Sequence, residues 1–124
     1  MIIRQRTTKH IFDTEDEFVS ALKRVGFGER DIEYIANHER DHFNVAQELG
    51  YKPQYEIKIF RVYFFGYLIK AKKIAQTECR IEPTKKDAIE IALAPRNPSL
   101  HDYEIAESAG GRVAARLKYM GLRG

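Results

Sequence analysis

The segment from Arg30 to Leu49 limits the fold of this chain more than any other, because its apolar residues recur at the spacing of a helical turn. At about 100° per residue they fall on one broad helix face. These residues are Ile32, Ile35, Ala36, Phe43, Val45, Ala46 and Leu49. Three titratable residues, His38, Glu39 and His42, project onto the same face. Buried polar groups are costly unless they are paired or bind a metal, so the segment predicts a helix with a functional site.

The three titratable residues form the pattern His-Glu-x-x-His. Residues four apart lie one turn apart on a helix, so His38 and His42 can bind one metal ion. Neutral imidazole is a good ligand for Zn²⁺, and a catalytic zinc site keeps one position open for water. Glu39 would lie beside that water and accept its proton. We therefore expect His38 and His42 as zinc ligands and Glu39 as the general base.

The two central positions of the pattern depart from the usual zinc peptidase sequence, in which they are uncharged. Here they are Arg40 and Asp41, which the helix geometry places on or near the polar side. The alternative interpretation is a surface helix with two solvated histidines. A motif match stays a hypothesis until its structural context is known.

Length and composition predict one soluble globular domain spanning residues 1–124, with 44% hydrophobic and 31% charged residues. The single cysteine, Cys79, cannot form an internal disulfide, which favours a cytoplasmic setting. No apolar run approaches the roughly 18 residues of a membrane span, and the N-terminus lacks a signal peptide. We therefore expect no membrane partner. A net charge of +3 permits nucleic-acid contact without arguing for it.

The rest of the chain predicts an α+β fold, with about four helices and a small antiparallel sheet of two to four strands. One strand is expected at residues 1–6. Others are expected over residues 55–81, where β-branched and aromatic residues alternate with polar ones. Gly66 and the Lys70–Lys73 stretch are the expected breaks between these strands.

Helix starts are marked by capping residues at Thr14, Thr84 and Ser99. The motif helix is expected to begin near Glu29 and to end at Gly50, which can adopt the left-handed conformation after a helix. The last helix is expected to run without interruption from Ser99 to about residue 119.

A zinc site needs a third protein ligand, and the candidates by residue type are His10, Glu48, Cys79, His101, Asp102, Glu104 and Glu107. Glu48 lies on the polar side of the motif helix, away from His42. Asp102 lies one turn before an apolar or small stripe formed by Ala106, Ala109, Gly110, Val113 and Leu117. His101 lies nearer the edge of that stripe. Asp102 also completes a capping box with Ser99, so both a ligand role and a purely capping role stay open.

A His-Glu-x-x-His helix, a following short sheet and a late helix opened by Ser-x-x-Asp resemble the zincin-type metallopeptidases. The resemblance is closest to the peptidase domains of AAA-linked zinc proteases and covers roughly residues 30–115. It implies a zincin-like fold, zinc bound by His38, His42 and Asp102, and Glu39 as the base that hydrolyses peptide bonds. Because the chain has no ATPase module or membrane anchor, we expect a minimal domain acting on peptides or already unfolded proteins.

Three other functions compete with this interpretation. Glu39 and His42 also form Glu-x-x-His, half of a di-iron motif, but no second copy is present. Basic residues interleave with aromatic ones over residues 58–73, which is a pattern of nucleic-acid-binding modules and also of half-buried sheets. A non-catalytic zinc-binding protein is the third alternative, because the sequence does not reveal an open coordination position.

Overall fold

The computed structural model describes residues 2–121 and contains five helices and one three-stranded antiparallel sheet. In chain order the elements are β1 (Ile3–Phe12), α1 (Glu15–Arg24), α2 (Glu29–Glu48), β2 (Pro53–Phe64), β3 (Tyr67–Cys79), α3 (Lys85–Ala92), α4 (Leu100–Ser108) and α5 (Arg112–Tyr119). The predicted α+β class is confirmed. Within this described part of the chain, no helix has the length and apolar content required to cross a membrane.

The sheet has the strand order β1-β2-β3, with β2 in the centre and antiparallel to both neighbours. The β2–β3 turn contains Phe65 and Gly66, whose φ angles of 49° and 81° suit a tight hairpin. The predicted break at Lys70–Lys73 is wrong. These residues pair with β2 throughout, and the sheet there is interrupted only by a register shift at Val62/Tyr63. The first strand also extends beyond the predicted residues 1–6, because each residue from Ile3 to Phe12 pairs with a residue of β2.

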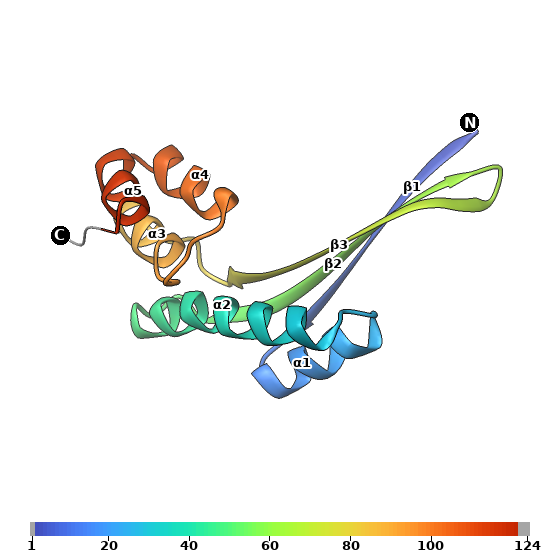
Figure 1. Ribbon diagram of the computed structural model, residues 1–124, viewed down its shortest axis with the longest axis horizontal. Coiled ribbons are helices and arrows are strands. Elements are labelled where there is room, and N and C mark those ends of the chain that lie inside the picture. The colour runs from blue at the N-terminus through green and yellow to red at the C-terminus, as the bar shows by residue number, and fades with distance from the viewer. Residues whose placement is uncertain (1, 122–124) are drawn as a thin grey trace.

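Helices α1 and α2 cover one face of the sheet near one end (Figure 1). The core between them includes Phe18, Leu22, Ile57 and Tyr55, each at most 3% exposed. The ring of Tyr55 stacks on the rings of Phe18 and Phe43, with centroid distances of 4.7 and 4.5 Å. These contacts hold α2 against β2 through Phe43, one residue after the motif, and they thereby set the position of the motif.

Helices α3, α4 and α5 form a smaller cluster beside the C-terminal half of α2, with Ala92, Ala106 and Ala115 in its core (Figure 1). The prediction of one helix from Ser99 to residue 119 is wrong, because the chain turns at Gly110, where φ is 94°. A Cβ at Gly111 would lie only 2.8 Å from the Ile89 side chain. The chain packs closely on α3 at this turn, and the apolar stripe expected on one continuous helix therefore does not form. Val113, assigned to that stripe, is 72% exposed.

Candidate metal centre

Helix α2 carries His38, Glu39 and His42 on its inward side. The helix starts after Gly28 and ends before Gly50, whose φ of 88° takes the chain out of the helix. Within it, Glu39 and His42 are buried, at 8% and 6% exposure, and His38 is partly buried. The inward orientation expected from helix periodicity is therefore present, and burial makes unpaired polar groups costly at Glu39 and His42.

Asp102 reaches these histidines from the first turn of α4. Its Oδ2 lies 2.9 Å from His38 Nε2, and its Oδ1 lies 3.2 Å from His42 Nε2. Among residues 2–121, these three side chains form the group of His, Cys, Asp or Glu residues that could hold a metal ion, with ligand atoms all within 4.8 Å of one another. The structure thus brings Asp102, predicted from the apolar stripe, to the two histidines of the motif.

Asp102 also keeps its predicted place in a capping box. Its backbone N–H donates to Ser99 Oγ at 3.1 Å, and the Ser99 N–H donates to Asp102 Oδ2 at 2.8 Å. Burial by itself raises the pKa of Asp102, but hydrogen bonds from His38, His42 and the Ser99 amide outweigh it and hold the pKa well below its usual range. The carboxylate is therefore anionic, and the cap fixes its position.

His42 is oriented by a second hydrogen bond, from its Nδ1 to the backbone carbonyl of Ile91 at 2.7 Å. A carbonyl only accepts, so Nδ1 carries the hydrogen and Nε2 faces Asp102. Such outer hydrogen bonds fix the tautomer of metal-binding histidines. Burial lowers the pKa of His42, but the hydrogen bond and charge of Asp102, with smaller effects of Glu39 and Ile91, raise it overall.

Glu39 is held by Thr77 on β3. The Thr77 hydroxyl lies 2.9 Å from Glu39 Oε1 and 3.1 Å from the Glu39 backbone carbonyl. Burial raises the pKa of Glu39 above its usual value, against the opposing charge of His42 and the hydrogen bond from Thr77. No pattern in the sequence links Thr77 to Glu39, because the contact exists only through the packing of α2 on β3.

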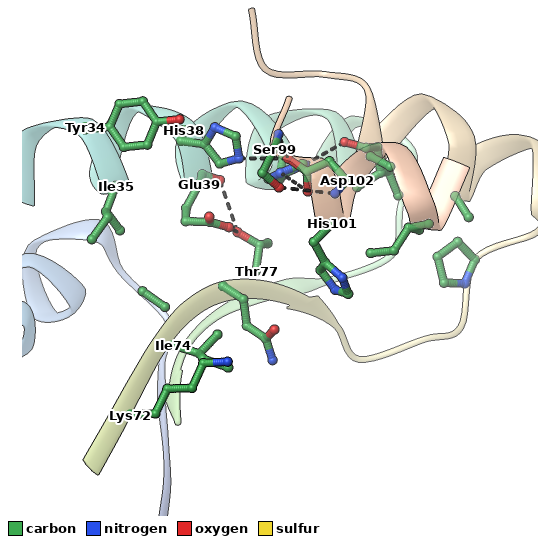
Figure 2. A pocket seen from close by; sticks show the side chains of 18 residues that line it. Tyr34, Ile35, His38, Glu39, Lys72, Ile74, Thr77, Ser99, His101 and Asp102 are labelled. Carbon is green, nitrogen blue, oxygen red and sulfur yellow. Dashed lines mark hydrogen bonds and ion pairs between the residues drawn. The ribbon is translucent and has the colours of Figure 1, made fainter. Parts of the chain in front are cut away.

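A pocket of about 650 Å³ opens over these residues. Figure 2 shows His38, Glu39 and Asp102 directed toward the same space, with Thr77 on the neighbouring strand. The rest of the lining is largely apolar and comes from α2, β3, α3 and α4; it includes Ile35, Ile74, Ala75, Ala88, Ile91, Ala92 and Ile105. Tyr34 lies at the margin and stacks on the His38 ring at 5.7 Å. A few polar groups converging in an apolar concavity are typical of a ligand-binding site.

The other candidate ligands lie elsewhere or point outward. His101 lines the pocket, but its side chain is 73% exposed and lies 4.0 Å from Glu104 rather than beside the motif histidines. Glu48 is exposed on α2, as its place on the polar side predicted. The remaining candidates, His10, Cys79, Glu104 and Glu107, are not part of the cluster.

The unusual Arg40 of the motif has a structural role. Its Nε and a terminal nitrogen lie 2.6 and 2.7 Å from the two carboxylate oxygens of Glu15 on α1. This paired contact lies on the solvent side of α2, and it lowers the pKa of Glu15. Arg40 therefore joins α1 to α2 without entering the pocket.

Comparison with protein-family models, with curated proteins and with solved structures gives no match for this chain.

Proposed function

We propose that the protein is a zinc-dependent metallopeptidase, with His38, His42 and Asp102 as metal ligands and Glu39 as the general base. The observation that carries this proposal is the convergence of His38, His42 and Asp102, whose ligand atoms all lie within 4.8 Å of one another; His42 Nε2 and Asp102 Oδ1 are 3.2 Å apart. Because Nδ1 of His42 donates to Ile91, a neutral His42 turns its Nε2 lone pair toward a carboxylate oxygen. Two acceptors in contact repel each other unless a proton or a cation lies between them.

The donor set favours zinc as that cation. Two imidazole nitrogens and one carboxylate oxygen match the three protein ligands of open catalytic zinc sites, which leave a fourth position for water. The Ile91 carbonyl accepts from His42 Nδ1, and the Ser99 amide donates to Asp102 Oδ2, the oxygen that also faces His38. These bonds hold the ligand atoms in place, as in other zinc sites.

Glu39 is the group best placed to move protons at this site. When bound, zinc would lower the pKa of a water ligand to about 7 and polarise a carbonyl group. The carboxylate of Glu39 lines the same pocket and is anchored by Thr77. It would accept a proton from the water and deliver it to the leaving amine, which is the role of glutamate in this motif.

An extended peptide is the substrate that suits the surroundings of the site. Strand β3 lies at an edge of the sheet, and its residues Lys72, Ile74 and Gln76 line the pocket. A substrate backbone could pair with this edge by strand addition, which depends little on the peptide sequence. The apolar part of the pocket would then take one side chain of the peptide.

Zinc stoichiometry after purification tests the metal site. The wild-type protein should bind about one zinc per chain, and His38→Ala or His42→Ala should abolish this stoichiometric binding. Arg40→Ala is the matched control, because Arg40 lies in the same motif but contacts Glu15 on the solvent side. Full zinc occupancy in both histidine variants would show that the site is misassigned.

Hydrolysis of an unfolded protein or peptide library by the zinc-loaded protein tests the enzyme. Glu39→Gln keeps nearly the same shape but cannot accept a proton, so zinc and fold should be retained while hydrolysis is lost. Loss of zinc from this variant would make Glu39 a ligand. No hydrolysis by zinc-loaded wild type would instead support a non-catalytic zinc-binding protein.

A further inference from the structure

The sheet extends well beyond the helices that cover it (Figure 1). We call this projection the arm, formed by residues 2–7 and 60–72. The arm contains five basic residues, Arg4, Arg6, Arg61, Lys70 and Lys72, and no acidic residue. The whole chain has a net charge of only +3, so the remainder is acidic overall. The arm is therefore cationic, and its innermost basic residue, Lys72, also lines the pocket.

The end of the arm, which we call the tip, consists of residues 2–3 and 64–69 and has no charged side chain. Its large apolar side chains are unusually exposed: Phe65 at 65%, Tyr67 at 77% and Ile69 at 60%. Ile2, Ile3, Phe64 and Leu68 are also exposed. Contiguous apolar surface of this kind on a protein marks an interaction site.

The basic residues of the arm begin directly behind the uncharged tip, where Arg4 follows Ile3 and Lys70 follows Ile69. Ile3 pairs with Phe64, and Phe64 pairs with Tyr67, so these residues lie together at the tip. Arg6 pairs with Arg61 three residues further along the strand, which corresponds to about 10 Å at the usual strand rise. We call Arg4, Arg6, Arg61 and Lys70 the collar; it starts one residue behind the tip and reaches to about 10 Å, which is comparable to the depth of roughly 5–10 Å to which interfacial segments enter a bilayer.

We propose that the arm docks on an anionic lipid bilayer, with the tip in the interfacial region and the collar at the lipid phosphates. Basic residues near a membrane surface are attracted by anionic lipids, and aromatic side chains favour the interface. Strands β1 and β3 are the outer strands of the sheet, and each has one edge without a neighbouring strand in the described part of the chain. Backbone groups on such an edge need water, so the tip would stay in the hydrated interfacial layer and not enter the hydrocarbon core. Docking of this kind needs no membrane-spanning segment.

The arrangement favours lipid over the two other partners. Basic and aromatic residues interleave in the arm, as they do in nucleic-acid surfaces, but the tip lacks charge and includes Ile2, Leu68 and Ile69, which have no flat face for bases. Two arms packed together would bring like charges of the collar into proximity. Of these three partners, only an anionic bilayer has an apolar layer to receive the tip and, outside it, a layer of negative phosphates to contact the collar.

Sedimentation of the protein with lipid vesicles tests the proposal. Wild type should bind vesicles of phosphatidylcholine with about one third phosphatidylserine, and should not bind phosphatidylcholine alone. Leu68→Ser with Ile69→Ser removes two apolar side chains from the tip. Arg6→Gln with Lys70→Gln removes two positive charges from the collar. Each double variant should weaken binding about tenfold or more.

Two matched controls remove equivalent exposed residues outside the arm. Leu100→Ser with Val113→Ser removes apolar side chains that are 76% and 72% exposed, and Lys85→Gln with Lys86→Gln removes two charges from α3; both should bind like wild type. Circular dichroism confirms that each variant is folded. Equal loss in arm and control variants, or failure of folded wild type to bind anionic vesicles, overturns the proposal. Tighter binding to a single-stranded oligonucleotide, or a dimer that the tip variant dissociates, overturns it in favour of those partners.

Discussion

The carboxylate of Asp102 lies 2.9 Å from His38 Nε2, although 64 positions separate the two residues in the chain. The same carboxylate oxygen accepts the backbone N–H of Ser99 at the start of α4. One side chain therefore caps a helix and completes the candidate metal centre. The cap ties the position of the carboxylate to the position of α4.

The two roles of Asp102 can be separated by substitution. Asp102→Asn retains an oxygen that can accept from Ser99 but loses the negative charge, so zinc affinity should fall by at least about tenfold. Ser99→Ala removes the cap acceptor and should lower the free energy of unfolding by about 1 kcal/mol while zinc remains bound. Competition with a chelator measures the first effect and urea unfolding the second. If zinc affinity is unchanged in Asp102→Asn, Asp102 acts only as a helix cap and is not a metal ligand.

Thr77 positions Glu39, so Thr77→Val should impair catalysis without removing zinc. Valine has nearly the same shape but cannot donate to the Glu39 carboxylate, which is 2.9 Å from the hydroxyl. We expect kcat to fall about tenfold or more and stability to decrease by about 1 kcal/mol. Thr7→Val, exposed on β1, is the control. If kcat is equal in both variants and the wild type, the contact has no role in positioning the base.

Tyr55 should make the protein sensitive to alkaline pH. Burial, with the nearby Glu15 carboxylate, raises the pKa of Tyr55 to about 12, whereas an unfolded tyrosine titrates near 10. Between these values the unfolded chain releases the proton and the folded chain keeps it. Stability therefore falls as pH rises from about 10 towards 12, by roughly 2–3 kcal/mol in all.

Tyr55→Phe keeps the stacked ring and lacks the titrating hydroxyl, so its stability should decline less over this pH range. Urea unfolding at a series of alkaline pH values measures the difference. Tyr67→Phe is the control, because Tyr67 is 77% exposed. Parallel stability curves for wild type and Tyr55→Phe would contradict the assigned shift.

Replacement of Gly111 by any residue with a side chain should destabilise the fold. A Cβ there would lie 2.8 Å from Ile89 and 2.9 Å from the Ala106 carbonyl, so Gly111→Ala should destabilise the protein by about 1–3 kcal/mol. Ser108→Ala, exposed at the end of α4, should change stability by less than about 0.5 kcal/mol. Thermal unfolding of both variants provides the measurement. Equal melting temperatures would show that α3 and α5 move apart at little cost.

Local sequence determined the elements that carry most of the candidate site. The period of apolar residues predicted α2 and the inward side of His38, Glu39 and His42, because each depends only on neighbours within a turn or two of helix. The helix starts after Thr14, Thr84 and Ser99 are local for the same reason, since a cap is a hydrogen bond over three residues. The α+β class followed from the change from helical to alternating periodicity.

Tertiary structure decided what joins these elements. The approach of Asp102 to His38, the hydrogen bond from Thr77 to Glu39 and the pairing of Arg40 with Glu15 each connect segments far apart in the chain. The break at Gly110 and Gly111 and the continuity of β3 through Lys70–Lys73 were mispredicted for a related reason. Gly110 and Gly111 were assigned to one long helix because small residues also occur inside helices. The Lys70–Lys73 stretch was assigned to a break because lysines also occur between strands. Packing against Ile89 and pairing with β2 settled these two segments, because long-range contacts outweigh weak local preferences.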